Sequence, residues 1–149
     1  MFLIFSVDAV HMMHRRENDT VLVKFEDGED VLEALDKIVK FYGIESGTVQ
    51  WGIGMLHDIE VGYWNGKEYE KKKYADRAEI VSFHGSIAFS EPRFHIHLSF
   101  AVRDHSVHGG HLFSGIVGPL LEIEIHVVNT ITISRKLNEK SGLKEIAIQ

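Results

Sequence analysis

EDVLEALDKIVKFY, residues 29–42, is the stretch that decides the fold class of this 149-residue chain. Its apolar positions recur at the three- and four-residue spacing of an amphipathic helix, and charged residues occupy the opposite face. Asp27 can accept hydrogen bonds from the free amides of the first turn, and Gly43 can take the left-handed conformation that ends a helix. The pattern predicts one principal helix.

The rest of the chain is patterned as strands. Short runs of β-branched and aromatic residues alternate with turn signals, of which Asn65-Gly66 is the strongest. One helix against a large, mainly antiparallel sheet is an α+β fold. We expect strands over residues 20–25, 48–55, 59–64, 67–74, 79–89, 93–102, 111–117, 120–128 and 130–136.

Length and composition favour a single domain. With 44% hydrophobic residues the chain can bury a substantial core, and it contains no internal repeat or linker. We expect residues 1–13 to form a peripheral N-terminal extension outside the core and residues 14–149 to form the domain. The apolar run Phe2–Phe5 is too short for a signal peptide, and no segment approaches the roughly 20 apolar residues of a membrane span. We therefore expect a cytoplasmic protein with no membrane partner.

Charge and cysteine content narrow the chemistry. The chain has 16 Lys and Arg against 22 Asp and Glu, a formal net charge of −6. An acidic domain is disfavoured on phosphate backbones, because nonspecific affinity for nucleic acids comes largely from basic side chains that displace counterions. The absence of cysteine excludes thiolate ligands, so that any metal must be held by nitrogen and oxygen donors.

Three histidines are spaced as a metal site would require. His95 and His97 are two apart in one predicted strand and so share a face of the sheet. A hairpin centred on Asp104 places His111 directly opposite His97, because each lies seven residues from the centre. Opposed side chains have Cβ atoms about 4.5–5.5 Å apart, and neutral imidazole is the commonest protein ligand for a transition metal. The sequence therefore predicts a site formed by His95, His97 and His111.

Further members of this site stay open at this stage. A regular turn at Glu91-Pro92 would place His84 opposite His97, and a turn at Gly118-Pro119 would place His126 opposite His111. One bulge would change either pairing. Glu91 could serve as a general base, although its spacing does not specify that role.

Three imidazoles without a thiolate would leave one coordination position of a bound ion open to water or a substrate oxygen, as in catalytic zinc sites. We therefore expect Zn²⁺ or another divalent transition metal. The competing interpretation is that the histidines merely pack, each with a single hydrogen bond. Gly109-Gly110 either supplies the turn before its strand or admits a close neighbour, such as a metal-bound ligand or a facing subunit.

Taken in order, several short motifs resemble the PPC domain, a domain conserved in plants and prokaryotes. The resemblance covers about residues 16–135, and the order of the motifs makes it specific. The motifs are Gly28-Glu29-Asp30, Gly52-Ile53-Gly54, residues 79–87 (EIVSFHGSI), Phe94-His95-Ile96-His97 and Gly109-Gly110-His111-Leu112.

The resemblance implies an α+β fold, a homotrimer and, as in prokaryotic members, a metal-associated cluster matching His95, His97 and His111. Plant members carry AT-hook segments with an Arg-Gly-Arg-Pro core before this domain, and this chain has no such segment. The leading hypothesis is a trimeric metal-binding protein whose site lies in or near a subunit interface. The alternatives are a DNA-binding, transcription-regulatory protein and a metal-dependent hydrolase or lyase acting on a small ligand.

Overall fold

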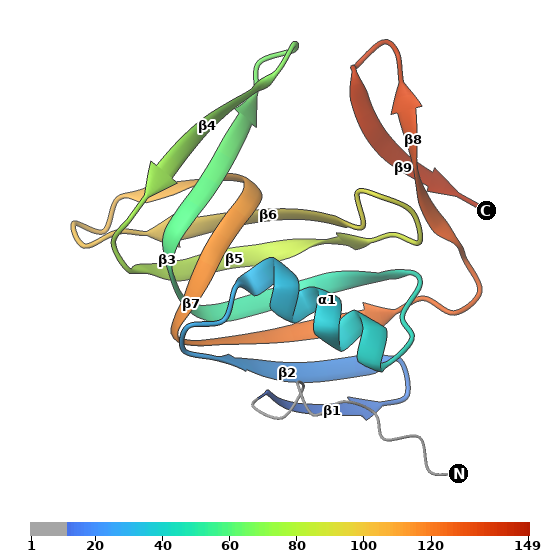
Figure 1. Cartoon of the computed structure of the whole chain (residues 1–149), viewed down its shortest axis with the longest axis horizontal. Helices are drawn as coiled ribbons and strands as arrows, with labels where there is room; N and C mark the ends of the chain where they lie inside the picture. Colours follow the sequence, from blue (N-terminus) through green and yellow to red (C-terminus); the bar gives the residue numbers. More distant parts are fainter. Residues whose placement is uncertain (1–11) are drawn as a thin grey trace.

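The computed structural model describes residues 12–149 and contains one seven-stranded sheet, one helix and a separate two-stranded sheet (Figure 1). The strands of the large sheet follow the order β1-β2-β7-β6-β5-β3-β4, with a further pairing of β7 with β3, and all pairs are antiparallel. The predicted single helix on a mainly antiparallel sheet is confirmed. The elements are β1 Met13–Glu17, β2 Thr20–Glu26, α1 Val31–Phe41, β3 Gly47–Trp64, β4 Tyr69–Tyr74, β5 Ala78–Ile87, β6 Phe94–Ala101, β7 Val107–Val127, β8 Ile133–Asn138 and β9 Leu143–Ile148.

Helix α1 begins two residues later than predicted, and its N-cap is therefore Asp30 instead of Asp27. The Asp30 side chain accepts hydrogen bonds from the backbone N–H groups of Leu32 and Glu33, both at 3.0 Å. Gly43 takes the expected left-handed conformation after the helix, with φ 62°. The predicted C-terminal glycine is therefore confirmed. An aspartate does cap the N-terminus, as predicted, but it is Asp30 and not Asp27.

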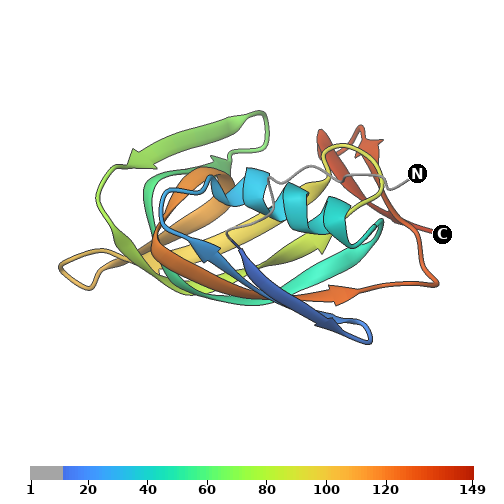
Figure 2. The ribbon, with the colours of Figure 1, turned by 60° about the horizontal axis from the view of Figure 1, so that its bottom comes forward.

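The core lies between α1 and one face of the sheet. Figure 2 shows the helix lying across the concave side of the curled sheet. The apolar face of α1, represented by Leu35 and Ile38, is buried there against β-strand residues such as Phe25 and Ile123, all at 1% exposure or less. Burial of this apolar stripe is the main force that holds the helix on the sheet.

Two long strands replace four predicted short ones. β3 runs unbroken through predicted strands 48–55 and 59–64, and β7 runs through 111–117 and 120–128. The predicted turn at Gly118-Pro119 is therefore wrong. The ladder between β3 and β7 is irregular at this point, where pairing passes from Val117 to Leu121. Pro119 lies in this gap, so its missing N–H removes no ladder hydrogen bond.

The two ends of the chain differ from expectation. Of the predicted extension, residues 1–11 lie outside the described part, whereas Met12 is buried in the core and Met13 begins β1. At the other end, β8 and the unpredicted β9 form a hairpin of their own. In residues 12–149 no helix is long and apolar enough to cross a membrane.

Candidate metal centre

Strands β6 and β7 bring the predicted histidines together in the predicted register. His97 pairs with His111 across these strands, and every neighbouring pair keeps the same symmetry about Asp104. His95 lies two residues before His97 on the same face of β6. The hairpin prediction is confirmed, because no bulge interrupts this ladder.

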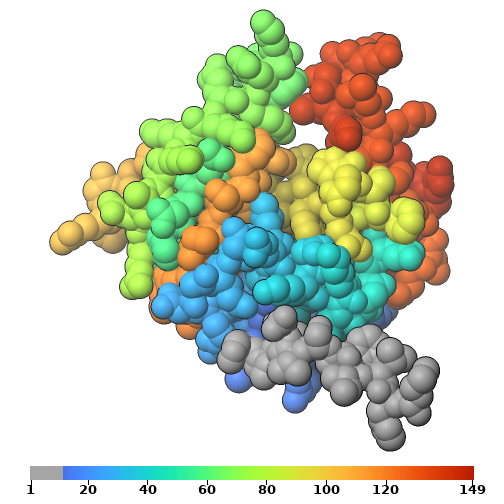
Figure 3. All heavy atoms as spheres, in the orientation of Figure 1, coloured from blue at the N-terminus to red at the C-terminus, as the bar shows by residue number. Residues whose placement is uncertain are grey.

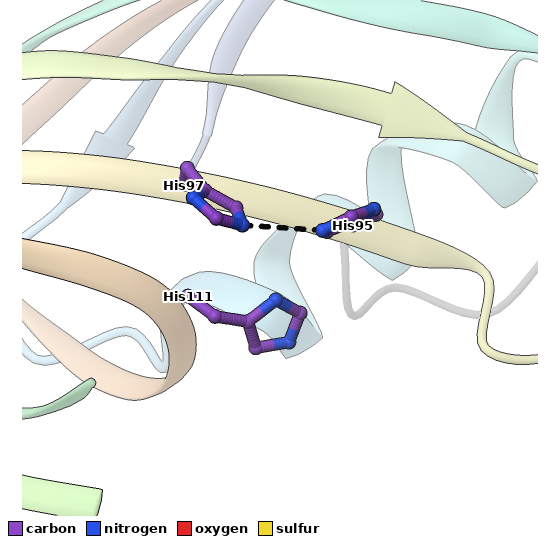
Figure 4. Close-up of side chains that lie close together, drawn as sticks. All are labelled: His95, His97 and His111. Carbon is purple, nitrogen blue, oxygen red and sulfur yellow. Dashed lines mark hydrogen bonds between the residues drawn. The ribbon is translucent and has the colours of Figure 1, made fainter. Parts of the chain in front are cut away.

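The three imidazoles converge on one point (Figure 4). Their ring centroids are 5.1 Å apart for His95 and His97, 5.1 Å for His95 and His111, and 5.5 Å for His97 and His111. One nitrogen from each ring can be chosen so that all three lie within 4.8 Å of one another. Among the described residues 12–149, these three histidines form the one group of His, Asp or Glu side chains that lie close enough together to hold a metal ion.

The surroundings keep these imidazoles neutral. The pKa of His111 is lowered from 6.5 to about 4, chiefly by burial and to a smaller extent by the nearby His95, His97 and Lys71. The pKa of His95 is lowered mainly by burial, and then by the nearby His97 and Arg135. The pKa of His97 is also lowered, mainly by burial and then by the nearby His84. Neutral imidazole is the form that donates a lone pair to a metal, so the site is prepared for ligation at neutral pH.

Two observations show that a tetrahedral metal ion fits these residues. Nitrogens bound at about 2.05 Å and at the tetrahedral angle stand roughly 3.3 Å apart, and the Nε2 atoms of His95 and His97 are 3.2 Å apart. The Nδ1 atom of His111 is buried without a hydrogen-bond partner in the described structure. A buried polar atom left unpaired costs free energy, which a coordinate bond would remove.

Aromatic side chains pack around His111. Its ring contacts those of Tyr69 and Phe113 at centroid distances of 4.9 and 4.8 Å, and the ammonium of Lys71 lies 3.9 Å from the centroid of Phe113. A Cβ atom at Gly62 would come within 2.5 Å of the Phe113 ring, so only glycine allows this close packing. These contacts fix the orientation of the His111 ring.

Gly109 and Gly110 serve neither as a turn nor as space for a ligand. Both lie within β7. A Cβ atom would come within 2.4 Å of the Leu98 carbonyl oxygen at Gly109 and within 2.7 Å of the Gly62 carbonyl oxygen at Gly110. The close neighbours are therefore the adjacent strands, and the glycines let β6 and β3 approach β7 next to His111.

The open candidates lie outside the cluster. His84 does pair with His97, as a regular turn at Glu91-Pro92 would require, but its ring does not join the ligand group. His126 pairs with Thr20 and Thr48, because β7 does not turn, so its predicted position opposite His111 is wrong. The Glu91 carboxylate accepts a hydrogen bond from the backbone N–H of Arg93 at 3.0 Å, within its own loop.

A cavity of about 610 Å³ adjoins the histidine cluster and was not foreseen from the sequence. His95 and His111 form part of its wall, together with aromatic residues of the large sheet and residues of the β8–β9 hairpin. Aromatic residues on strands are usually core residues, so no sequence signal indicated that these line a cavity. Arg135 also lines the cavity, and nothing in its local sequence marks it.

Comparisons with known proteins agree with this architecture. Residues 12–129 match the family model of the Plants and Prokaryotes Conserved (PCC) domain, and the chain belongs to that family. No curated protein sequence matches it. The motif order noted in the sequence therefore identified the family correctly.

Several solved structures share the fold. A candidate DNA-binding protein from Bacteroides thetaiotaomicron has a TM-score of 0.84 and 25% identity, over 91% of this chain and 96% of its own. A metal-containing protein from Archaeoglobus fulgidus has a TM-score of 0.80 and 25% identity, over 91% and 98%. A plant- and prokaryote-conserved protein from Pyrococcus horikoshii has a TM-score of 0.76 and 28% identity, over 91% and 95%.

Proposed function

We propose that this protein binds one divalent transition metal ion, Zn²⁺ in the first place, through His95, His97 and His111. The observation that carries the proposal is the convergence of three neutral imidazoles, two of whose nitrogens already stand at the spacing of tetrahedral ligands. The similar metal-containing protein from Archaeoglobus fulgidus supports it. A zinc ion held by three imidazoles keeps a position for water or a substrate oxygen and supplies Lewis acidity there.

The proposal includes a homotrimer, which the family resemblance implies, with the metal site in or near a subunit interface. Its support in this chain is a group of exposed apolar side chains on the outer face of the sheet. Leu22 and Trp51 both pair with Glu124 and therefore share a face, and the exposed Ile53 lies two residues beyond Trp51. Such groups are typical of interfaces. Native mass spectrometry should give three times the chain mass; a monomer would contradict this part.

Metal analysis of protein purified without an affinity tag tests the central claim. We expect stoichiometric zinc in the wild-type protein and loss of nearly all of it in the double variant H95A/H97A, because two of three ligands are gone. The matched control is H84A/H126A, which removes two exposed histidines of the same sheet that lie outside the cluster. Metal-free wild-type protein, or equal metal in both double variants, would refute the proposal.

DNA binding is the alternative that the similar candidate DNA-binding protein from Bacteroides thetaiotaomicron favours. The net charge of −6 weighs against it here, because affinity for phosphate backbones comes largely from basic side chains. Fluorescence anisotropy with an A·T-rich duplex at low salt separates the two functions. Affinity that falls steeply with added salt would support DNA binding, and no measurable binding would exclude it.

A metal-dependent hydrolase or lyase is favoured by one observation, the cavity that reaches His95 and His111. The part of the chain that the structure describes offers no carboxylate that joins the histidine cluster as a general base. Turnover of a small ester or hydroxy acid that is lost both on chelation and in H95A/H97A would establish this activity. Turnover that survives in H95A/H97A would assign it to a contaminant.

A further inference from the structure

The cavity beside the histidine cluster has walls from two separate parts of the fold. One wall belongs to the large sheet and includes Tyr69, Phe94 and Phe113, and the facing wall belongs to the β8–β9 hairpin and includes Leu143 and Ile146. Figure 3 shows the surface hollowed between the β3–β4 and β8–β9 hairpins. A volume of about 610 Å³ lies within the range of small-molecule sites. The cavity is thus large enough for an organic molecule with an apolar body.

Arg135 provides a positive charge in this cavity. Its guanidinium is half-buried and held by three hydrogen bonds to neutral acceptors: Nε donates to the Pro92 carbonyl at 3.2 Å, and one terminal nitrogen donates to the carbonyl and the hydroxyl oxygen of Ser86, at 3.2 and 2.9 Å. The second terminal nitrogen makes no hydrogen bond in the described part of the chain. These contacts fix the side chain without neutralising it.

No carboxylate in residues 12–149 forms an ion pair with Arg135. Glu145 lines the same cavity, but its carboxylate accepts hydrogen bonds from Asn138 and Ser141 of its own hairpin, at 3.0 and 2.6 Å. The half-buried Arg93 is different, because Asp36 lies 3.5 Å from its guanidinium. A partly desolvated cation without a counterion is costly and attracts an anion.

We propose that this cavity binds a small organic anion, with its carboxylate or phosphate group on Arg135 and its apolar body between Phe94, Phe113 and Ile146. Arg135 and the hairpin lie beyond residues 12–129, which the family model matches. The anion site does not require a metal on the histidines, although His95 and His111 share its wall.

Three probes of similar size test the proposal by NMR titration of the full-length protein: benzoate, phenyl phosphate and the neutral benzamide. We expect at least one anion to bind about tenfold or more tightly than benzamide, the effect of a charge-assisted hydrogen bond. Binding of benzoate alone or of phenyl phosphate alone supports the proposal and identifies the anionic group. Equal binding of benzamide, or binding of none of the three, overturns it.

Variants locate the anion. R135M should weaken anion binding about tenfold or more, and R135K should retain part of it. The control R103M removes an exposed arginine in the turn after β6 and should leave anion binding unchanged. I146D places a negative charge in the cavity at a residue that is 50% exposed and therefore tolerates the change, whereas I148D changes a 64% exposed residue of the same strand outside it. Binding lost in I146D but kept in I148D supports the proposal; binding unchanged in R135M and I146D overturns it.

The titrations are repeated on chelated protein, and zinc content is measured in R135M. Anion binding to the metal-free protein sustains the anion site even when the metal proposal fails. Stoichiometric zinc in R135M sustains the metal site even when the anion proposal fails. The two proposals therefore succeed or fail separately.

Discussion

The two halves of β7 differ in how their residues are chosen. The second half, Val117–Val127, alternates buried and more accessible side chains from Leu120 onward, with Leu121, Ile123 and Ile125 fully buried in the core. The first half, Val107–Gly115, shows no such alternation and carries Gly109, Gly110 and His111. The residues of one half form the core, and those of the other allow close strand contact and position the His111 imidazole. The hydrophobic core and the proposed metal site thus depend on opposite ends of a single strand.

The core half should show the largest effect on stability. I123A removes a fully buried side chain and should lower the free energy of unfolding by about 3 kcal/mol, from lost burial and the remaining cavity. V107A, at a 57% exposed position in the first half of the same strand, should cost far less. Urea unfolding measures both. Zinc stoichiometry should be unchanged in folded I123A; its loss would mean that the two halves are not separable.

The site half should respond to pH. The folded pKa of His111 is about 4, below the ordinary 6.5, so the unfolded chain binds more protons between these values. Stability of the metal-free protein is therefore full above pH 6.5 and falls as pH drops toward 4, by about 1 kcal/mol between pH 7 and pH 5 once solvent screening of this partly exposed ring is allowed for.

The lowered pKa values of His95 and His97 act in the same direction. Urea unfolding of chelated protein at the two pH values measures the loss. H111Q, which cannot titrate, should lose less, whereas H126A should behave as the wild type. An equal pH effect in H111Q would remove His111 as its source.

The smallest expected effect is the difference in stability between two glycine variants, G66A and G110A, which separates the cost of backbone strain from the cost of a close strand contact. Gly110 and Gly66 have φ of 153° and 95°, conformations that other residues rarely adopt, but a Cβ atom at Gly66 meets nothing within 4 Å. G66A should cost about 1 kcal/mol for strain alone, and G110A about 1 kcal/mol more for its contact with the Gly62 carbonyl. Zinc affinity should fall only in G110A, because His111 is the next residue. Equal zinc affinity in both variants would contradict this.

Local patterns predicted the elements that depend on local rules. The helix follows from the periodicity of residues 31–41, and the pairing of His97 with His111 follows from a hairpin without a bulge. The pairing of His126 failed because Gly118-Pro119 resembles a turn in sequence but lies inside β7, at an irregularity of the β3–β7 ladder. A strand can pass through a proline where no ladder bond is required, and a single sequence does not show where that is.

The sequence by itself determined a mainly antiparallel sheet with one helix, the family and the three-histidine set. These depend on periodicity, motif order and the symmetry of one hairpin, which act over short distances along the chain. The tertiary structure alone decided the burial that lowers the pKa of His111 and the placement of Arg135 beside the cluster. The reason is that desolvation and charge pairing depend on what packs around a group, and the residues around His111 and Arg135 come from strands far apart in the chain.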